Sequence, residues 1–195
     1  MLLKFFILFA SIFIMLPDSS SQILIDFTKE QQQRWQVVND GVMGGISQST
    51  LLRFENYAEF RGTVSLENNG GFASVRTIQP ANLSNFDGIR ISTLGDDKVY
   101  SIRLKPIINN RLTAYSYEAR FEASADGWQV YDIPFSAFKP VYRGSQLRNV
   151  PRLNTAAIGE IGIMIKDGQE GSFSLKIQKI EAYKSAVSKV SNTIE

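Results

Sequence analysis

The sequence predicts an all-β protein, built as an antiparallel β-sandwich or jelly roll from a chain of 195 residues. Along most of the chain, apolar and polar residues alternate with a period of two, which is typical of strands that bury one face. Turn-forming pairs such as Asp126-Gly127 separate the alternating segments. No long segment has the apolar spacing of a helix, and many short strands of this kind favour a sandwich.

Five strands are predicted in the first half of the chain, each an alternating segment that ends at a turn signal. The clearest is 57–66, YAEFRGTVSL. In it Ala58, Phe60 and Val64 share one face, while charged and polar residues occupy the other. In chain order the five strands are 23–27, 35–39, 48–54, 57–66 and 72–78.

Six strands are predicted in the second half from the same alternation. In the last of them the apolar phase slips between Ile177 and Ile180, which predicts a β-bulge near Gln178–Lys179. The segment 136–157 lacks the alternation and is predicted to be a long loop with room for one helical turn. In chain order the six strands are 88–94, 99–107, 113–123, 128–135, 158–166 and 171–184.

The ends of the chain differ from this pattern. Residues 1–21 combine an early Lys4, an apolar run at 5–16 and then small residues, which predicts a secretory signal peptide. The run is shorter than the roughly 20 residues that span a bilayer as a helix, so an uncleaved membrane anchor is the alternative. We therefore predict export to the periplasm or the exterior, a folded domain at 22–184 and a flexible tail at 185–195.

Composition excludes several classes of function. Lys and Arg total 21 and Asp and Glu 19, so the net charge of +2 lacks the basic excess expected for a nucleic-acid partner. The chain has no histidine and no cysteine, which excludes Ser-His-Asp, Cys-His and histidine-metal chemistry. The run GVMGG at 41–45 matches no phosphate-binding glycine motif, and no lysine follows it. We therefore expect no catalytic residues of these kinds, no nucleotide and no cofactor.

Paired carboxylates are the remaining catalytic alternative, because they hydrolyse glycosides without histidine. Glu118 and Glu122 share a strand face, and Asp126 and Asp132 would share one if their strand were continuous. In a β-protein such residues are mostly solvated, so a protein without catalytic activity is favoured.

A structural calcium ion is a further alternative, since carboxylates and backbone carbonyls are the ligands that calcium prefers. Asp26, Asp40 and Glu181 are conceivable ligands. No Asp-rich loop motif accompanies them, so ordinary surface carboxylates are favoured and metal binding stays open.

One sheet face has the composition of a ligand site. Arg76, Arg103 and Lys105 fall on polar strand faces, and Tyr115 and Tyr117 share a face with each other. Aromatic rings beside polar donors are typical of sites that bind sugars or peptides. A solvated face covered by long side chains is the alternative.

Five stretches of the chain form a set that occurs in a known family: WQVVNDGVMGGISQS, FRGTVSLENNGGFASVR, NFDGIRI, WQVYDIPFSAFKPVYRG and IGEIGIMIKDGQEGSFSLKIQKIEAY. Together they resemble the family of complex I intermediate-associated protein 30. The similarity covers about 24–184 in the family's order.

The resemblance implies a galactose-binding-domain-like β-sandwich, similar to carbohydrate-binding modules, with no established catalytic site. Mitochondrial members of the family are assembly chaperones for the membrane respiratory enzyme that oxidises NADH. The sequence thus predicts a non-catalytic binding module that acts in protein interaction, as a chaperone-like assembly factor. The alternative is a carbohydrate-binding module of an exported protein.

Within such a sandwich, the stretch 35–49 predicts a tight corner. Trp35 is expected to anchor the core or its rim, and Gly41 to take a positive φ in the turn. The other glycines would allow close backbone approach, Ser47 would hydrogen-bond the turn and Phe72 would enter the core. The residues of this structural motif are Trp35, Asp40, Gly41, Met43, Gly44, Gly45, Ser47, Gly70, Gly71 and Phe72.

If the two glycine corners lie on one rim, they frame a recognition surface with polar groups of its own. Donors and rings from the strand faces described above would complete it. The residues predicted to bind a ligand are Asp40, Asn68, Asn69, Arg76, Arg103, Tyr115 and Tyr117.

Overall fold

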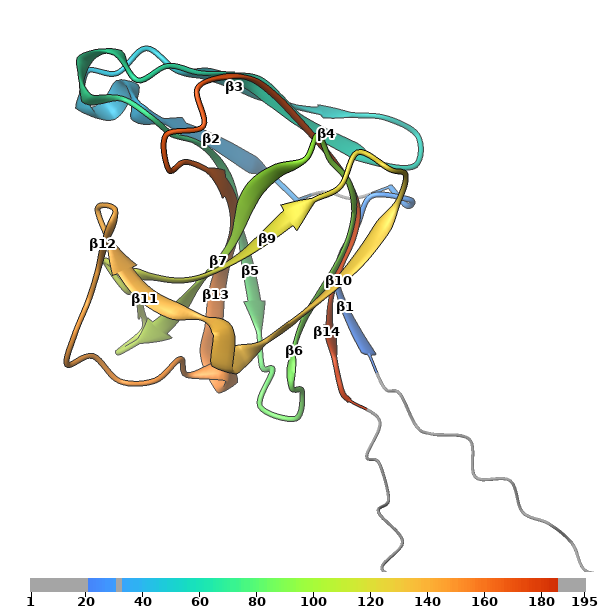
Figure 1. The fold of residues 1–195 in the computed structure, drawn as a ribbon. Coiled ribbons are helices and arrows are strands. Elements are labelled where there is room, and N and C mark those ends of the chain that lie inside the picture. Colours follow the sequence, from blue (N-terminus) through green and yellow to red (C-terminus); the bar gives the residue numbers. More distant parts are fainter. Residues whose placement is uncertain (1–20, 31–32, 186–195) are drawn as a thin grey trace, which may run out of the picture.

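Two antiparallel sheets packed face to face form a β-sandwich (Figure 1), which confirms the predicted fold class. The computed structural model describes residues 21–30 and 33–185. The six-stranded sheet has the spatial order β10 (Gln129–Pro134), β6 (Gly88–Leu94), β14 (Gly171–Tyr183), β4 (Ala58–Val64) and β3 (Gln48–Arg53), with β1 (Ser21–Asp26) paired to β14. The eight-stranded sheet has the order β12 (Ser145–Gln146), β11 (Lys139–Tyr142), β9 (Ser116–Ala123), β7 (Lys98–Ile108), β13 (Ile158–Ile165), β5 (Ala73–Ala81) and β2 (Trp35–Asn39), with β8 (Arg111–Leu112) paired to β7.

The core lies between the sheets and is made by alternate residues of the long strands. Ile161, Ile163 and Ile165 of β13 are fully buried there. Phe60 of β4 and Phe173 of β14 pack edge to face, with ring centroids 4.9 Å apart. Burial of each such side chain contributes roughly 1.5–3 kcal/mol. The period-two alternation of the sequence is therefore the direct cause of the two-layer fold.

The outward residues of β13 are buried as well. Glu160 is 9% exposed and Met164 8%, although both point away from the core. The outer face of a sandwich sheet is ordinarily in contact with water. Burial on both faces of β13 therefore marks a place where the eight-stranded sheet and its connections enclose a hollow.

The long strand β14 contains the bulge predicted near Gln178–Lys179. Its register with β6 shifts between Ile177 and Lys179, which confirms the prediction. At this point β14 also changes its other neighbour, since the residues before the bulge pair with β4 and those after it pair with β1. The bulge keeps both Ile177 and Ile180 inside the core.

All eleven predicted strands are present; β2 and β6 have the predicted ends, and the ends of the others differ by one to three residues. Three short strands, β8, β11 and β12, were not predicted. Two of them lie in the segment 136–157, which was predicted to be a loop, together with the 3₁₀ turn η4 (Thr155–Ala157) and most of η3 (Phe135–Ala137). Strand β11 forms through its pairing with β9, which a local alternation pattern cannot report.

The predicted leader and tail fall mainly beyond the part of the chain that the structure describes. Residues 1–20 and 186–195 lie outside the described residues, and β1 begins at Ser21. Within residues 21–30 and 33–185, no helix has the length and apolar character needed to cross a membrane.

Candidate functional site

The main candidate site is a hollow of about 710 Å³ on the outer face of the eight-stranded sheet, which we call the concave cleft. Met43 and Phe72 wall it on one side and Tyr142 on the other. In Figure 1 this face lies on the left of the molecule, between η1 (Asp40–Met43) and the β11–β12 hairpin. Its charged floor, supplied by β5, β7, β9, β13 and the residue that follows β13, consists of Arg76, Arg103, Lys105, Glu118, Glu160 and Lys166.

Glu118 is the more buried carboxylate of the charged floor, with 9% of its side chain exposed. Its Oε1 lies 2.6 Å from Lys166 Nζ, and its Oε2 lies 3.7 Å from Arg103 Nε. The second separation exceeds hydrogen-bond length. Neither Glu118 Oε2 nor Arg103 Nε has a hydrogen-bond partner among the described residues. A buried acceptor and a buried donor therefore face one another across a gap.

The guanidinium of Arg103 is poorly solvated. Burial lowers the pKa of Arg103, the carboxylates of Glu118 and Glu160 oppose this effect, and the neighbouring charge of Arg76 adds to it. Its Nη1 donates only to the sulfur of Met164, at 3.4 Å, which is a weak acceptor. Because arginine remains charged in proteins, its guanidinium keeps N–H donors that lack a strong hydrogen-bond acceptor.

Glu160 is the second carboxylate of the charged floor and is also shared by two cations. It lies 3.8 Å from Lys105 Nζ and 3.9 Å from Arg76 Nε. Arg76 Nε instead donates to Gln36 Oε1 at 3.1 Å. The side chains of Glu118 and Glu160 are 9% and 12% exposed, against 17–35% for the four cations. The cations of the charged floor are therefore more accessible to a ligand than its carboxylates.

The wall beside β2 depends on the buried carboxylate of Asp40. Its Oδ1 accepts a hydrogen bond of 2.9 Å from the backbone N–H of Ser47, whose hydroxyl donates to Oδ2. Oδ2 also accepts from the N–H groups of Gly71 and Phe72, at 2.7 and 3.3 Å. Burial opposes ionisation, but these hydrogen bonds outweigh it and hold the pKa of Asp40 below its ordinary value. The network fastens η1 to the start of β5.

Close backbone approach at this corner is present as predicted. A Cβ on Gly45 would lie 2.4 Å from Asp40 Cγ, and one on Gly70 would lie 2.7 Å from Asp40 Oδ2. The prediction for Gly41 was wrong, because the turn is a 3₁₀ helix and the positive φ, 95°, falls at Gly44, which ends it. Glycine is the residue that takes this conformation at least cost.

The structure brings Arg76 and Arg103 together in the concave cleft. The oxygens of Asp40 are occupied by its own network. Asn68 and Asn69 are exposed in η2 (Glu67–Asn69), with φ of 55° and 58°, and do not line the cleft. Whether these five residues bind a ligand stays a prediction.

Tyr115 and Tyr117 do not form the exposed platform expected from the sequence. Tyr117 is 2% exposed, and its hydroxyl donates to the carbonyl of Pro151 at 2.5 Å. Burial raises the pKa of Tyr117 to about 12. Tyr115 packs against it edge to face, with the ring centroids 5.7 Å apart. The parity of β9 directs Tyr117 into the core and Glu118 into the cleft.

Phe72 differs from its prediction as well. Strand β5 begins with Ala73, which faces the core, so the alternation turns Phe72 outward to the cleft wall, where it is half-buried. Trp35 packs at the rim of the core as predicted, with its ring centroid 5.8 Å from that of Phe27. Met43 is exposed at the end of η1 and lines the cleft.

Three cleft residues, Glu160, Lys166 and Tyr142, were not identified from the sequence. The first two lie in and just after β13, where the outward positions Gly162 and Met164 are small or apolar. Two successive outward positions that are small or apolar indicate burial on both faces of the strand, and this is a signal by which the sequence could have indicated the cleft. Tyr142 lies in the segment predicted to be a loop.

The carboxylate pairs considered for glycoside hydrolysis do not converge. Glu118 and Glu122 share the outer face of β9, but Glu122 is exposed and does not line the cleft. Asp132 is bound by Arg90 at 2.6 Å, and Asp126 is exposed in the turn before β10.

The three residues considered as calcium ligands each interact with a different set of neighbours. Asp26 accepts from the N–H of Thr28 at 3.0 Å, and Glu181 lies 3.7 Å from Arg90 Nη1. Asp40 is occupied by the corner network. Over the described ranges, no group of three or more His, Cys, Asp or Glu side chains is placed to hold a metal ion.

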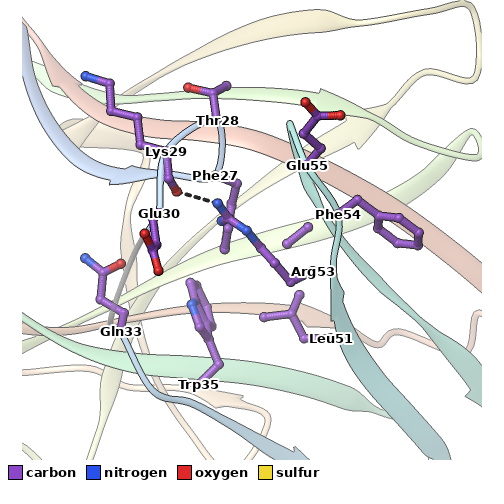
Figure 2. Close-up of a pocket in the computed structure, with 11 residues that line it drawn as sticks. Phe27, Thr28, Lys29, Glu30, Gln33, Trp35, Leu51, Arg53, Phe54 and Glu55 are labelled. Atoms are coloured by element: carbon purple, nitrogen blue, oxygen red, sulfur yellow. Dashed lines mark hydrogen bonds between the residues drawn. The ribbon is translucent and has the colours of Figure 1, made fainter.

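A second hollow, of about 700 Å³, opens between the β1–β2 connection and the β3–β4 hairpin (Figure 2). Arg53 reaches into it toward Lys29, to whose carbonyl it donates. The Arg53 guanidinium also lies 5.2 Å from the centre of the Phe27 ring, a favourable cation–π distance. Because this cation is already engaged, the second hollow offers fewer free groups than the concave cleft.

Sequence comparison identifies relatives of the chain. The family model described as complex I intermediate-associated protein 30 matches residues 25–177. "Uncharacterized protein C9E9.15" of Schizosaccharomyces pombe is 31% identical over 173 residues, which cover 77% of this chain and 78% of that protein.

Structural comparison shows the same fold in solved proteins. The family 11 carbohydrate-binding module of Clostridium thermocellum, in complex with a β-1,3-1,4-mixed-linked tetrasaccharide, matches with a TM-score of 0.62 and 16% identity, over 85% of this chain and 96% of that one. An agarase matches with a TM-score of 0.55 and 10% identity, over 86% of this chain and 25% of that one. A family 29 carbohydrate-binding module with mannohexaose matches with a TM-score of 0.51 and 8% identity, over 86% and 93%. At these identities the likeness concerns the fold alone.

Proposed function

The chain belongs to the complex I intermediate-associated protein 30 family, and from this premise we propose that it is a non-catalytic binding module that holds a carbohydrate in the concave cleft. The observation that carries the proposal is the unpaired donor Arg103 Nε facing the unpaired acceptor Glu118 Oε2 at 3.7 Å. A sugar hydroxyl both accepts and donates a hydrogen bond. One hydroxyl beside the pair, at about 2.8 Å from each atom, would accept from Arg103 Nε and donate to Glu118 Oε2. Both atoms are buried, so this contact requires the two side chains to shift toward the cleft.

The size and walls of the cleft support the same proposal. Its volume of about 710 Å³ lies in the range of small-molecule sites. Phe72 and Tyr142 supply apolar surface on opposite walls, above the polar floor. The family 11 module, which shares the fold, was solved with a tetrasaccharide. The proposal includes export by the leader at 1–21, which would bring the module to polysaccharides outside the cytoplasm.

The test is binding to a panel of neutral and acidic polysaccharides, followed by affinity electrophoresis and calorimetry. Glu118→Gln removes the acceptor charge and is expected to weaken binding about tenfold or more. The matched control is Glu122→Gln, which makes the same change on the same face of β9 outside the cleft and should bind as the unchanged protein does. Thermal unfolding of each variant confirms folding. Failure of the unchanged protein to bind any member of the panel would overturn the proposal.

The exposed apolar end of η1 favours a second candidate function, the binding of a protein partner. Val42, Met43 and Ile46 are 73%, 58% and 49% exposed. Apolar groups gathered at one exposed corner mark interaction sites. The name of the family, complex I intermediate-associated protein 30, is in keeping with association with another protein.

Replacing Val42 and Met43 together by serine is expected to abolish capture of such a partner, because the variant loses the apolar contact area. The measurement is a cross-linked pull-down, repeated with the captured protein after its purification. Ile78→Ser is the control, since Ile78 is also 58% exposed but lies on β5 away from η1. Equal capture by the double variant contradicts this second candidate.

A further inference from the structure

The charges of the concave cleft are unbalanced. Five basic side chains line it, against the two carboxylates Glu118 and Glu160. The whole chain has a net charge of only +2, so the local excess of positive charge equals or exceeds that of the whole protein. The four cations of the charged floor share Glu118 and Glu160, and three of these four separations are 3.7–3.9 Å. Lys166 Nζ also lies 3.8 Å from Asp167, which does not line the cleft. Such pairs are too long to satisfy the hydrogen-bond donors of the cations.

We propose that the ligand of the concave cleft is an acidic polysaccharide, whose carboxylate or sulfate groups bind between Arg103, Lys105 and Arg76. The proposal rests on the proposed carbohydrate function and specifies its ligand. The side chains of Arg76, Arg103 and Lys105 are 35%, 23% and 19% exposed, so an anionic group in the cleft can accept hydrogen bonds from their exposed parts. Hydrogen bonds between ionised partners are roughly twice as strong as neutral ones.

The exposure of the charged groups in the cleft favours an acidic polysaccharide over a neutral one. The two carboxylates are 9% and 12% exposed and the four cations of the charged floor 17–35%, so the cations are the more accessible groups. Arg143, at the wall formed by the β11–β12 hairpin, lies over the Tyr142 ring at 5.5 Å and adds a fifth cation. A neutral glycan would leave this excess of positive charge uncompensated in a site partly shielded from water. An anionic glycan neutralises it.

The shape of the cationic surface separates this ligand from a nucleic acid. The cations are confined to one hollow of about 710 Å³ and do not form a stripe along a strand or an edge. Recognition of a nucleic-acid backbone uses an extended basic face. A short segment of an acidic polysaccharide fits a cluster of cations that is confined to one hollow.

The experiment compares polymers that differ only in charge. Polygalacturonate and its methyl ester form the carboxylate arm, and dextran sulfate and dextran form the sulfate arm. We expect the protein to bind the acidic member of at least one pair about tenfold more tightly than the neutral member. Raising the salt concentration from about 50 to about 500 mM should weaken the acidic complex strongly and leave any neutral complex unchanged.

Variants identify the cleft as the cause. Arg103→Gln and, separately, Lys105→Gln are each expected to weaken binding of the acidic polymer about tenfold. Lys105 is included because its partner Glu160 keeps Arg76 as a neighbour, so the variant is the less disruptive one. Arg111→Gln, at an exposed site on β8 outside the cleft, removes the same charge as a control.

The possible outcomes distinguish the carbohydrate function from the narrower proposal that the carbohydrate is acidic. Equal binding of the acidic and neutral members would overturn the acidic ligand and leave the carbohydrate function standing. Absence of binding to every polymer would overturn both. Equal losses in Arg111→Gln and Lys105→Gln would show a diffuse charge effect and also overturn the acidic ligand. Selective loss in the two cleft variants supports it.

Discussion

Replacing Asp40 by asparagine is expected to lower the free energy of unfolding by about 3 kcal/mol. The carboxylate is fully buried and accepts from three backbone N–H groups and one hydroxyl, contributed by Ser47, Gly71 and Phe72. An amide of the same size keeps one acceptor oxygen but places an NH2 group where the other oxygen accepted, so the buried donors that faced that oxygen lose their acceptor. Chemical denaturation of the variant and the unchanged protein measures the difference.

The pH dependence supplies a second measurement on the same variant. Because the folded protein holds the pKa of Asp40 below its ordinary value, the stability that the ionised group contributes is full above that ordinary value. It is lost as the pH falls through the lower, folded pKa. The difference in unfolding free energy between the two proteins should therefore shrink as the pH falls through the acid range below about pH 4. A difference that is small, or constant across this range, contradicts the role assigned to Asp40.

The surface carboxylate Asp126 provides the control for this substitution. Asp126 is exposed in the turn before β10, and only its backbone groups form hydrogen bonds among the described residues. Asp126→Asn should leave the unfolding free energy within about 0.5 kcal/mol.

Replacing Gly45 by alanine is expected to lower the free energy of unfolding by about 2–4 kcal/mol. The added methyl group would lie 2.4 Å from Asp40 Cγ and 2.5 Å from Asp40 Oδ1. Asp40 is short, buried and fixed by its hydrogen bonds, so it cannot move aside without breaking them. The measurement is again the midpoint and slope of chemical denaturation.

Gly41→Ala is the matched control from the same corner. An added methyl group at Gly41 meets no atom within 4 Å, and its φ is not positive. Its stability should be unchanged or slightly raised, because alanine restricts the unfolded chain. In the double variant of Gly45→Ala with Asp40→Asn, the two losses should be less than additive, since both break one network. Full additivity contradicts this explanation.

The fold could be predicted because apolar and polar residues alternate along most of its strands. Strands such as β2 and β6 were predicted with their observed ends because they alternate and end at turn residues. The bulge in β14 was predictable because a slip in the apolar phase has to be compensated in the backbone. The β11–β12 hairpin was not predicted, because its four-residue and two-residue strands are too short for a pattern and depend on β9.

The candidate site was predictable only in part. Arg76 and Arg103, which line the cleft, were identified because charged residues on the polar face of a predicted strand can be read directly from the sequence. Tyr117 was assigned to the wrong side of the sheet, since alternation gives the relative faces of residues and not which face meets the core. The ion pairs of Glu118 with Arg103 and Lys166 join residues from different strands, and no local pattern reports them.

The pairing of Ser21 with Tyr183 places the beginning of β1 and the end of β14 at the same point of the six-stranded sheet. The concave cleft belongs to the other sheet (Figure 1). A tether joined to Ser21 or Tyr183 would therefore leave from the sheet that does not carry the concave cleft. Because the start of β1 and the end of β14 lie together, both can be joined to a host protein or a support at one place. The concave cleft then stays accessible.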